Sequence, residues 1–186
     1  MTFSLRTGLK WIWILAILSC LILYFIAPST FAKESIASFI AQHHKYSWAV
    51  YFLIHLLRGF VLLPSTPLIF AGVLLFPENP FWVLSISLIG ILSSSLLIYF
   101  FSDKLGFSTF FKKKGAKIVQ IEKHLSGKFG GLYITLWSFI PVVPTDLICY
   151  VSGALKIKIP VFLISIFVGE LILCAIYIYG GLSLIS

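Results

Sequence analysis

Few residues of this chain have types that could do chemistry, and the clearest are charged side chains inside apolar segments. Asp146 follows two prolines in an otherwise uncharged run, Glu170 lies in the middle of another apolar run, and Arg58 lies in a third. Charges at membrane depth are costly, and they usually bind substrates, carry protons or pair with one another. Arg58 could pair with Asp146 or Glu170, or bind a lipid phosphate through two hydrogen bonds. We therefore take these three residues as candidate substrate or proton sites.

Each of these residues also has a structural interpretation. Asp146 could cap the helix that follows Pro144 by accepting backbone N–H bonds. Arg58 could extend its head group to the membrane interface, and Glu170 could serve only as its partner. His55 lies one helical turn before Arg58, where we expect a packed or hydrogen-bonded side chain rather than a proton relay.

The sequence patterns of common enzymes and metal sites do not occur in this chain. Its four histidines form no HExxH motif, and its three cysteines lie in apolar runs without a CxxC pair. There is also no GxSxG motif and no phosphate-binding glycine loop. We therefore expect no metal, no cofactor and no catalytic residue, so that the protein is not an enzyme.

The composition places the candidate residues in a membrane protein. Hydrophobic side chains make up 60% of the 186 residues and charged ones 11%, and the mean hydropathy is +1.06. A water-soluble fold could not cover so much apolar surface with so few charges. The net charge of +8 comes mainly from lysines between apolar segments, as the positive-inside bias predicts, and we expect no nucleic-acid binding.

Three apolar segments have about the length of a membrane-spanning helix. A bilayer core of about 30 Å needs roughly 20 residues of helix, and residues 11–27, 81–101 and 160–185 come close to or exceed that length. The first segment could belong to a signal peptide cleaved near Ala32, but the long apolar run favours an uncleaved helix. In the second, Gly90 and Ser94 form a small-xxx-small pair suited to helix–helix contact.

Two further apolar segments, residues 47–76 and 129–155, are each interrupted by a Pro-x-x-Pro sequence. A single crossing by each would place lysine-rich loops on opposite sides of the membrane, against the positive-inside bias. Two crossings by the first would leave about 15 residues each, fewer than the roughly 17 that a span requires. A re-entrant hairpin that turns at the prolines satisfies both conditions. Because proline breaks the helix, it leaves backbone polar groups without partners, and lipid cannot bond to them. The tips must therefore be buried in protein or line a wet cavity.

The predicted fold is therefore all-α: a polytopic membrane protein with three full transmembrane helices and two opposed re-entrant hairpins, arranged as an inverted repeat. Interrupted apolar segments at matching places in two halves are the best sequence indicator of a transport site. The hairpin residues with predicted structural roles are Pro64, Pro67, Pro141 and Pro144 at the tips, and Gly72 and Gly153 beyond them, where close backbone approach is expected. Thr66 and Thr145 beside the tips complete the candidate site.

Residues 102–128 form the one segment that resembles a soluble chain, and they hold seven of the 14 basic residues. Apolar residues recur at helical spacing among the lysines. The segment is either a basic amphipathic helix on an anionic membrane face or a solvated loop that only sets the topology. Its candidate lipid-surface residues are Lys112, Lys113, Lys114 and Lys117. We expect this segment and the N-terminus on the cytoplasmic side of a bacterial inner membrane.

The residues around both tips resemble the DedA superfamily, whose members are also called SNARE-associated or VTT-domain proteins. The resemblance is carried by Arg58-Gly59-Phe60-Val61-Leu62-Leu63-Pro64-Ser65-Thr66-Pro67 leading to Ala71-Gly72, and by Phe139-Ile140-Pro141-Val142-Val143-Pro144-Thr145-Asp146 leading to Tyr150-Val151-Ser152-Gly153. It covers roughly residues 47–181. The resemblance implies two opposed re-entrant hairpins and movement of lipids across the bilayer, such as undecaprenyl-phosphate recycling or phospholipid scrambling. In other members it implies proton-dependent transport.

The chain departs from the pattern of many DedA proteins at both tips. Ser65 and Thr66 stand where acidic residues are common, and Ser138 and Pro144 stand where arginines are common. The second hairpin therefore lacks an arginine pair for a phosphate group, which weighs against undecaprenyl phosphate as the substrate.

The predicted function is movement of a lipid, of phospholipid or polyprenyl-phosphate type, through a polar groove between the hairpins. The expected partners are membrane lipids. Two alternatives stay open: a proton-coupled transporter of a small solute, and a membrane scaffold without transport activity.

Overall fold

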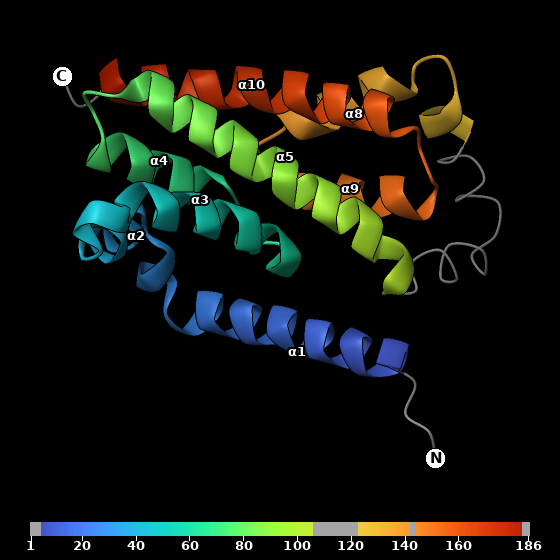
Figure 1. The fold of residues 1–186 in the computed structure, drawn as a ribbon, viewed down its shortest axis with the longest axis horizontal. Helices are drawn as coiled ribbons and strands as arrows, with labels where there is room; N and C mark the ends of the chain where they lie inside the picture. Colours follow the sequence, from blue (N-terminus) through green and yellow to red (C-terminus); the bar gives the residue numbers. More distant parts are fainter. Residues whose placement is uncertain (1–4, 106–122, 142–143, 184–186) are drawn as a thin grey trace.

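The structure is a computed structural model that describes residues 5–105, 123–141 and 144–183, and within them every regular element is a helix. This confirms the predicted all-α class for the described part of the chain. The helices shown in Figure 1 are α1 (Leu5–Ile26), α2 (Lys33–Ala41), α3 (Ser47–Arg58), α4 (Thr66–Leu75), α5 (Pro80–Lys104), α8 (Gly130–Phe139), α9 (Thr145–Ala154) and α10 (Ile159–Ser183), with short 3₁₀ helices η1 (Pro28–Phe31), η2 (His44–Tyr46) and η3 (Gly59–Val61).

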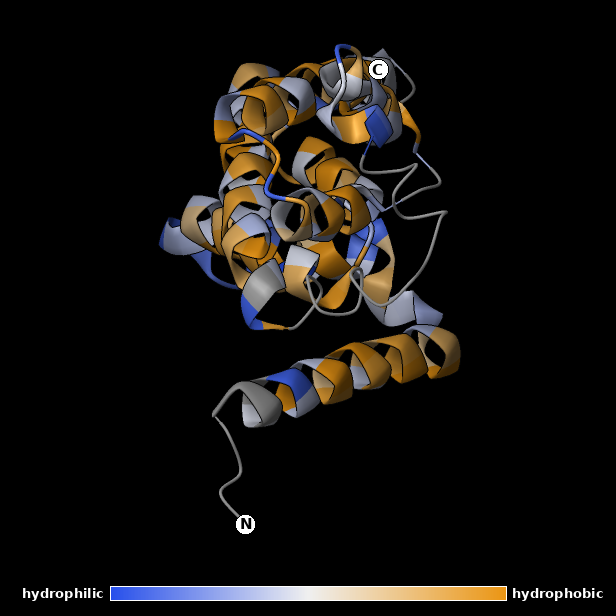
Figure 2. Ribbon diagram, turned by 90° about the vertical axis from the view of Figure 1, so that its right-hand side faces the viewer, coloured by the Kyte–Doolittle hydropathy of each residue, from blue (hydrophilic) through white to orange (hydrophobic). Residues whose placement is uncertain are grey.

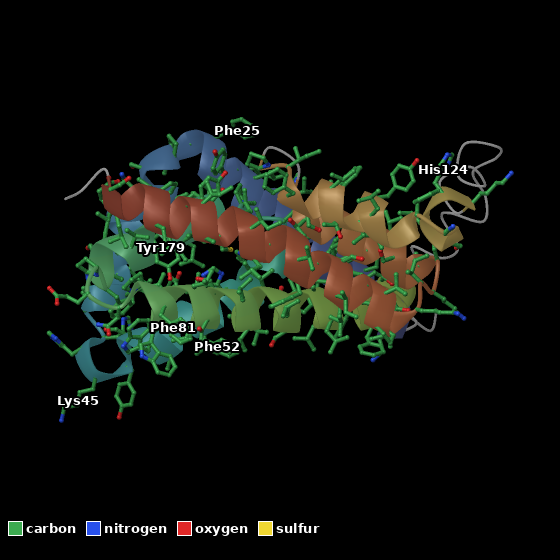
Figure 3. All side chains as sticks on the ribbon, turned by 90° about the horizontal axis from the view of Figure 1, so that it is seen from above. Phe25, Lys45, Phe52, Phe81, His124 and Tyr179 are labelled. Atoms are coloured by element: carbon green, nitrogen blue, oxygen red, sulfur yellow. The ribbon has the colours of Figure 1, made fainter. Side chains whose placement is uncertain are left out.

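Two helices of the described chain are long and apolar enough to cross a bilayer, Pro80–Ser102 within α5 and Ile159–Ser183, which is α10. They run antiparallel, with α10 along the upper edge of the molecule in Figure 1 and α5 below it. Large apolar side chains such as Phe81, Phe100 and Ile164 are exposed along them, at 63%, 54% and 63%. Lys45 and His124 lie at opposite ends of the molecule (Figure 3). Exposed apolar sides between polar ends are expected of a protein surrounded by lipid.

The first proline-interrupted segment folds out and back. Tyr51 of α3 shares a hydrogen bond of 2.7 Å with Ser87 of α5, so α3 lies along the first half of α5. After the turn, Phe76 at the end of α4 stacks on Trp48 at the start of α3, with 3.6 Å between ring centroids. Gly72 of α4 lies directly against the Tyr51 ring, where a Cβ atom would collide. The two ends of this helical hairpin therefore lie together.

The second segment has the same arrangement with its own long helix. Thr135 of α8 donates a hydrogen bond of 3.2 Å to the backbone oxygen of Ser165 in α10, and Gly169 of α10 lies against Ser138. The chain then turns and α9 returns, until Gly153 near its end touches the Tyr99 carbonyl of α5. Here too the backbone approaches so closely that a Cβ atom would collide.

The second arm of each hairpin packs more on the long helix of the other half than on that of its own half, and α4 also packs extensively on α2. The helix α9 packs on α5, and α4 packs on α10, whereas the first arms α3 and α8 pack on the long helices of their own halves. Ile98 of α5, Ile148 of α9 and Phe162 of α10 are buried in the resulting core. Because α5 and α10 are antiparallel, the two hairpins start from opposite ends of the molecule and their turns meet between those ends.

The helix α1 lies apart from the other helices and is largely hydrophobic (Figure 2). Trp13 attaches it to the body, since its indole nitrogen donates to the Phe60 oxygen at 2.8 Å and to the Tyr150 hydroxyl at 3.0 Å. Lys112, Lys113, Lys114 and Lys117 lie outside the described residues, so the predicted amphipathic surface helix remains a prediction.

Candidate functional site

The turns of the two hairpins are joined by a buried ion pair. Arg58 is the last residue of α3, and Asp146 is the second residue of α9. Nη1 of Arg58 lies 3.1 Å from Oδ2 of Asp146, and the two residues are only 5% and 2% exposed. Charge-assisted hydrogen bonds of this kind are among the strongest polar contacts in proteins. Of the two acids that could pair with Arg58, the structure places Asp146 beside it.

Arg58 also holds the turn of its own hairpin. Its Nη1 donates a second hydrogen bond, of 3.0 Å, to the backbone oxygen of Leu63. The chain reverses just before this point, where Leu62 adopts a left-handed conformation with φ of 60°. The guanidinium therefore satisfies a carbonyl that the proline-interrupted helix leaves free.

One edge of the Arg58 guanidinium has no partner among the described residues. Its Nε and Nη2 atoms are buried and make no hydrogen bond there. These two nitrogens lie on the same side of the planar group, and their N–H bonds form a fork that matches two oxygens of a phosphate or carboxylate. The free edge can therefore take an anion in addition to the existing pair with Asp146.

Glu170 belongs to a separate polar contact next to this pair. It is fully buried in α10, and its Oε1 accepts a hydrogen bond of 2.6 Å from the Thr145 hydroxyl. Cys174 approaches the other carboxylate oxygen at 3.9 Å. Thr145 thus bridges α9 to α10 one residue before Asp146, and the two acids lie in neighbouring parts of one buried polar cluster.

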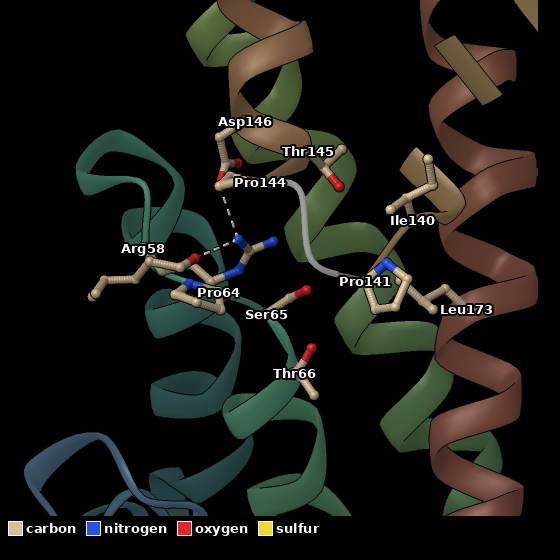
Figure 4. A pocket seen from close by; sticks show the side chains of 11 residues that line it. Arg58, Pro64, Ser65, Thr66, Ile140, Pro141, Pro144, Thr145, Asp146 and Leu173 are labelled. Atoms are coloured by element: carbon tan, nitrogen blue, oxygen red, sulfur yellow. Dashed lines mark hydrogen bonds and ion pairs between the residues drawn. The ribbon is translucent and has the colours of Figure 1, made fainter. Parts of the chain in front are cut away.

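A small cavity of about 40 Å³ lies between the two hairpin turns (Figure 4). Thr66 and Ser65 line it from the first turn, and Thr145 lines it from the second. Its lining also contains the ion pair and the tip prolines: Arg58, Leu63, Pro64, Ile140, Pro141, Pro144, Asp146 and Leu173. Hydroxyl and charged groups therefore converge with prolines of both hairpins at one place.

The structural proline and glycine residues lie at the ends and contact points of these helices. Pro67 is in the first turn of α4, and Pro144 immediately precedes α9. Proline fits there because the first residues of a helix have no intrahelical use for their N–H groups. Pro64 and Pro141 lie in the turns themselves, while Val142 and Val143 of the second turn lie outside the described residues.

Three buried serines of α5 and α9 were not among the predicted site residues. Ser94, Ser95 and Ser152 are buried, and their hydroxyls have no hydrogen-bond partner within the described chain. Ser94 lies against Gly59, the residue after Arg58. The small-xxx-small pair in α5 predicted a helix contact at this serine, but spacing alone carries no information about a nearby ion pair.

His55 packs beneath this site. It is fully buried in α3, its ring meets Tyr51 edge-on with 4.7 Å between centroids, and Gly90 lies against its Cβ atom. Neither ring nitrogen has a hydrogen-bond partner in the described part of the structure. The side chain is therefore packed, with both nitrogens left for water or for another group.

These features define a class of protein: an α-helical membrane protein with two matching helical halves and a charged site where their hairpins meet. The family model of the VTT domain matches residues 63–183, which includes both hairpin turns from Leu63 onward and both long helices. The chain belongs to this family, the DedA or SNARE-associated family, in agreement with the resemblance seen at the tips. Searches of curated proteins and of solved structures returned no match.

Proposed function

We propose that this VTT-domain protein moves lipids across the bilayer along the polar site between its two hairpins. The observation that carries the proposal is the buried Arg58–Asp146 pair at the meeting point of the turns, with one edge of Arg58 unused. A charged site enclosed by apolar helices is costly to build and is expected at a substrate pathway. A lipid headgroup, of phospholipid or polyprenyl-phosphate type, has the charge and the oxygen atoms that such a site binds.

The proposal includes a topology. Residues 11–27, 81–101 and 160–185 would cross the membrane fully, and residues 47–76 and 129–155 would be re-entrant from opposite faces. The out-and-back paths of the two hairpins support this. Phe76 after α4 stacks on Trp48 at the start of α3, and the start of α8 and the end of α9 both lie near the start of α10. The N-terminus and the lysine-rich segment would be cytoplasmic, in a bacterial inner membrane.

The size of the cavity implies how movement would proceed. A volume of about 40 Å³ holds a few waters but no lipid headgroup. The two turns must therefore separate, and the Arg58–Asp146 contact is the bond that this separation breaks. A phosphate group that binds Arg58 would compensate for the lost carboxylate contact, while Thr66 and Thr145 would offer hydroxyls to the moving headgroup. The lipid tails would stay in the bilayer.

A proton-coupled transporter of a small solute is the second candidate. The observation that favours it is the second acid, since Glu170 is fully buried and bonded to Thr145 next to Asp146. Neighbouring buried carboxylates that can exchange protons are typical of proton relays. A lipid-moving protein needs only the arginine and its partner.

The test is a lipid-translocation assay with purified protein in liposomes that carry a fluorescent phospholipid, in which an impermeant reductant bleaches the outer leaflet. We expect bleaching beyond the outer-leaflet half with the wild-type protein. The double variant Arg58→Gln/Asp146→Asn, which leaves no unpaired buried charge, should lose this excess, and Lys45→Gln at the exposed end should keep it. Wild-type protein that behaves like protein-free liposomes would overturn the proposal and favour a scaffold.

A further inference from the structure

A second and larger pocket opens beside the site, on the side of α1 and α2. Its volume is about 310 Å³, and it lies between the end of α1, η1, α2 and the first hairpin. We call it the side pocket. Its apolar walls include Tyr24, Phe31, Phe39, Ile54 and Leu68.

Arg58 belongs to the lining of both pockets. It is shared, together with Leu63 and Pro64, by the side pocket and by the small cavity between the turns. Arg58, whose Nε and Nη2 atoms have no partner among the described residues, therefore lies where a polar cavity and an apolar pocket meet. A ligand that fits both must have an anionic group at one end and a hydrocarbon chain at the other.

The charges around the side pocket also favour a ligand with an anionic group rather than a cationic one. Among the described residues that line it, Arg58 is the one charged residue, and none carries a carboxylate. Asp146 lines the other cavity and bonds Nη1 of Arg58, while Nε and Nη2 have no partner among the described residues. A cationic amphiphile would place its charge against the guanidinium and would be repelled. An inorganic anion would leave the apolar walls unused.

We propose that the side pocket binds one hydrocarbon chain of a phosphate-bearing lipid, whose phosphate oxygens accept hydrogen bonds from Nε and Nη2 of Arg58. The inference rests on the proposed function and narrows it, because it assigns a chain-binding site and a side of access. The helix α1 is attached to the body through Trp13 near its middle, and the side pocket lies at its C-terminal end. A lipid therefore reaches Arg58 from the bilayer between α1 and the first hairpin.

The test uses an alkyl phosphate with a photoreactive diazirine on its chain, added to the full-length protein in phosphatidylcholine nanodiscs. We expect saturable labelling of peptides from η1, α2 or α4, which dodecyl phosphate competes away. Ser35 and Ile36 line the pocket, whereas Ser38 on the same helix does not. Ser35→Trp and Ile36→Trp should each weaken labelling by roughly tenfold, since lost contact for about two methylene groups suffices for that factor. Ser38→Trp should label as the wild type does.

The other outcomes separate the sources of the signal. The matching alkyl trimethylammonium probe should not label these peptides, and inorganic phosphate should not compete at the concentration of dodecyl phosphate that does. The proposed chain-binding site would be wrong if the wild type and both pocket-filling variants were labelled equally. It would also be wrong if inorganic phosphate competed as effectively as dodecyl phosphate. If labelling occurred as expected but the protein moved no lipid in liposomes, the proposed function would be wrong and the proposed binding site would stand.

Discussion

Arg58 and Asp146 are 88 residues apart in the chain, yet Nη1 of one lies 3.1 Å from Oδ2 of the other in the interior of the molecule. The contact joins the end of the first arm of one hairpin to the start of the second arm of the other. It is a charged link between the two hairpin turns, and it lies among apolar helices that face lipid.

The ion pair predicts unequal effects of single and double substitution. Arg58→Gln or Asp146→Asn alone should each lower stability by about 3–5 kcal/mol, because each leaves an uncompensated buried charge. The double variant should be more stable than either single variant. Thermal unfolding in the same detergent measures this, and a double variant that loses the sum of the two single losses would show that the residues are not coupled.

The contact between α9 and α5 predicts that Gly153 tolerates no larger side chain. A Cβ atom there would meet the Tyr99 carbonyl and the Ser102 hydroxyl, and the carbonyl cannot move aside cheaply. Gly153→Val should therefore lower the free energy of unfolding by about 1–3 kcal/mol or more. The matched control is Gly180→Ala in α10, which has no neighbour within 4 Å. It should leave stability unchanged or raise it slightly, since alanine favours the helix.

The bond between Thr145 and Glu170 predicts how lipid movement and proton coupling can be told apart. Glu170→Gln keeps an oxygen that accepts the Thr145 hydrogen bond, so the fold and the rate of lipid movement should change less than about twofold. If the protein instead couples protons to solute uptake, this variant should abolish the pH dependence of uptake in liposomes. Loss of lipid movement in a folded Glu170→Gln variant would contradict the mechanism in which Arg58 and Asp146 suffice.

The re-entrant topology predicts the labelling of single cysteines. In a variant without the three native cysteines, Glu78→Cys should react with an impermeant maleimide from outside the cell. Lys114→Cys and Lys156→Cys should react only after permeabilisation, because a hairpin between them returns the chain to the same face. Labelling that places positions 114 and 156 on opposite sides would show that the second hairpin crosses the membrane.

The amino-acid sequence by itself determined the environment of this protein and the kind of elements it contains. Long apolar runs predict helices in lipid, because every backbone group must there be bonded within its own segment. Prolines in two of those runs marked the breaks between α3 and α4 and between α8 and α9. These are local properties, and they can be read from neighbouring residues. The charged residues of the site could be named for the same reason, since each one interrupts an apolar run.

Only the tertiary structure decided which of these residues meet. In the sequence, Asp146 and Glu170 are equally plausible partners for Arg58. In the structure, the second arm of each hairpin crosses to the opposite long helix. This crossing places Asp146 at the guanidinium and Glu170 at Thr145. The side pocket likewise combines α1, α2 and the first hairpin, whose packing leaves no periodic signal. Hydropathy shows how strongly a segment prefers lipid to water. It does not show which other segment that segment packs against, and a site built between segments depends on this packing.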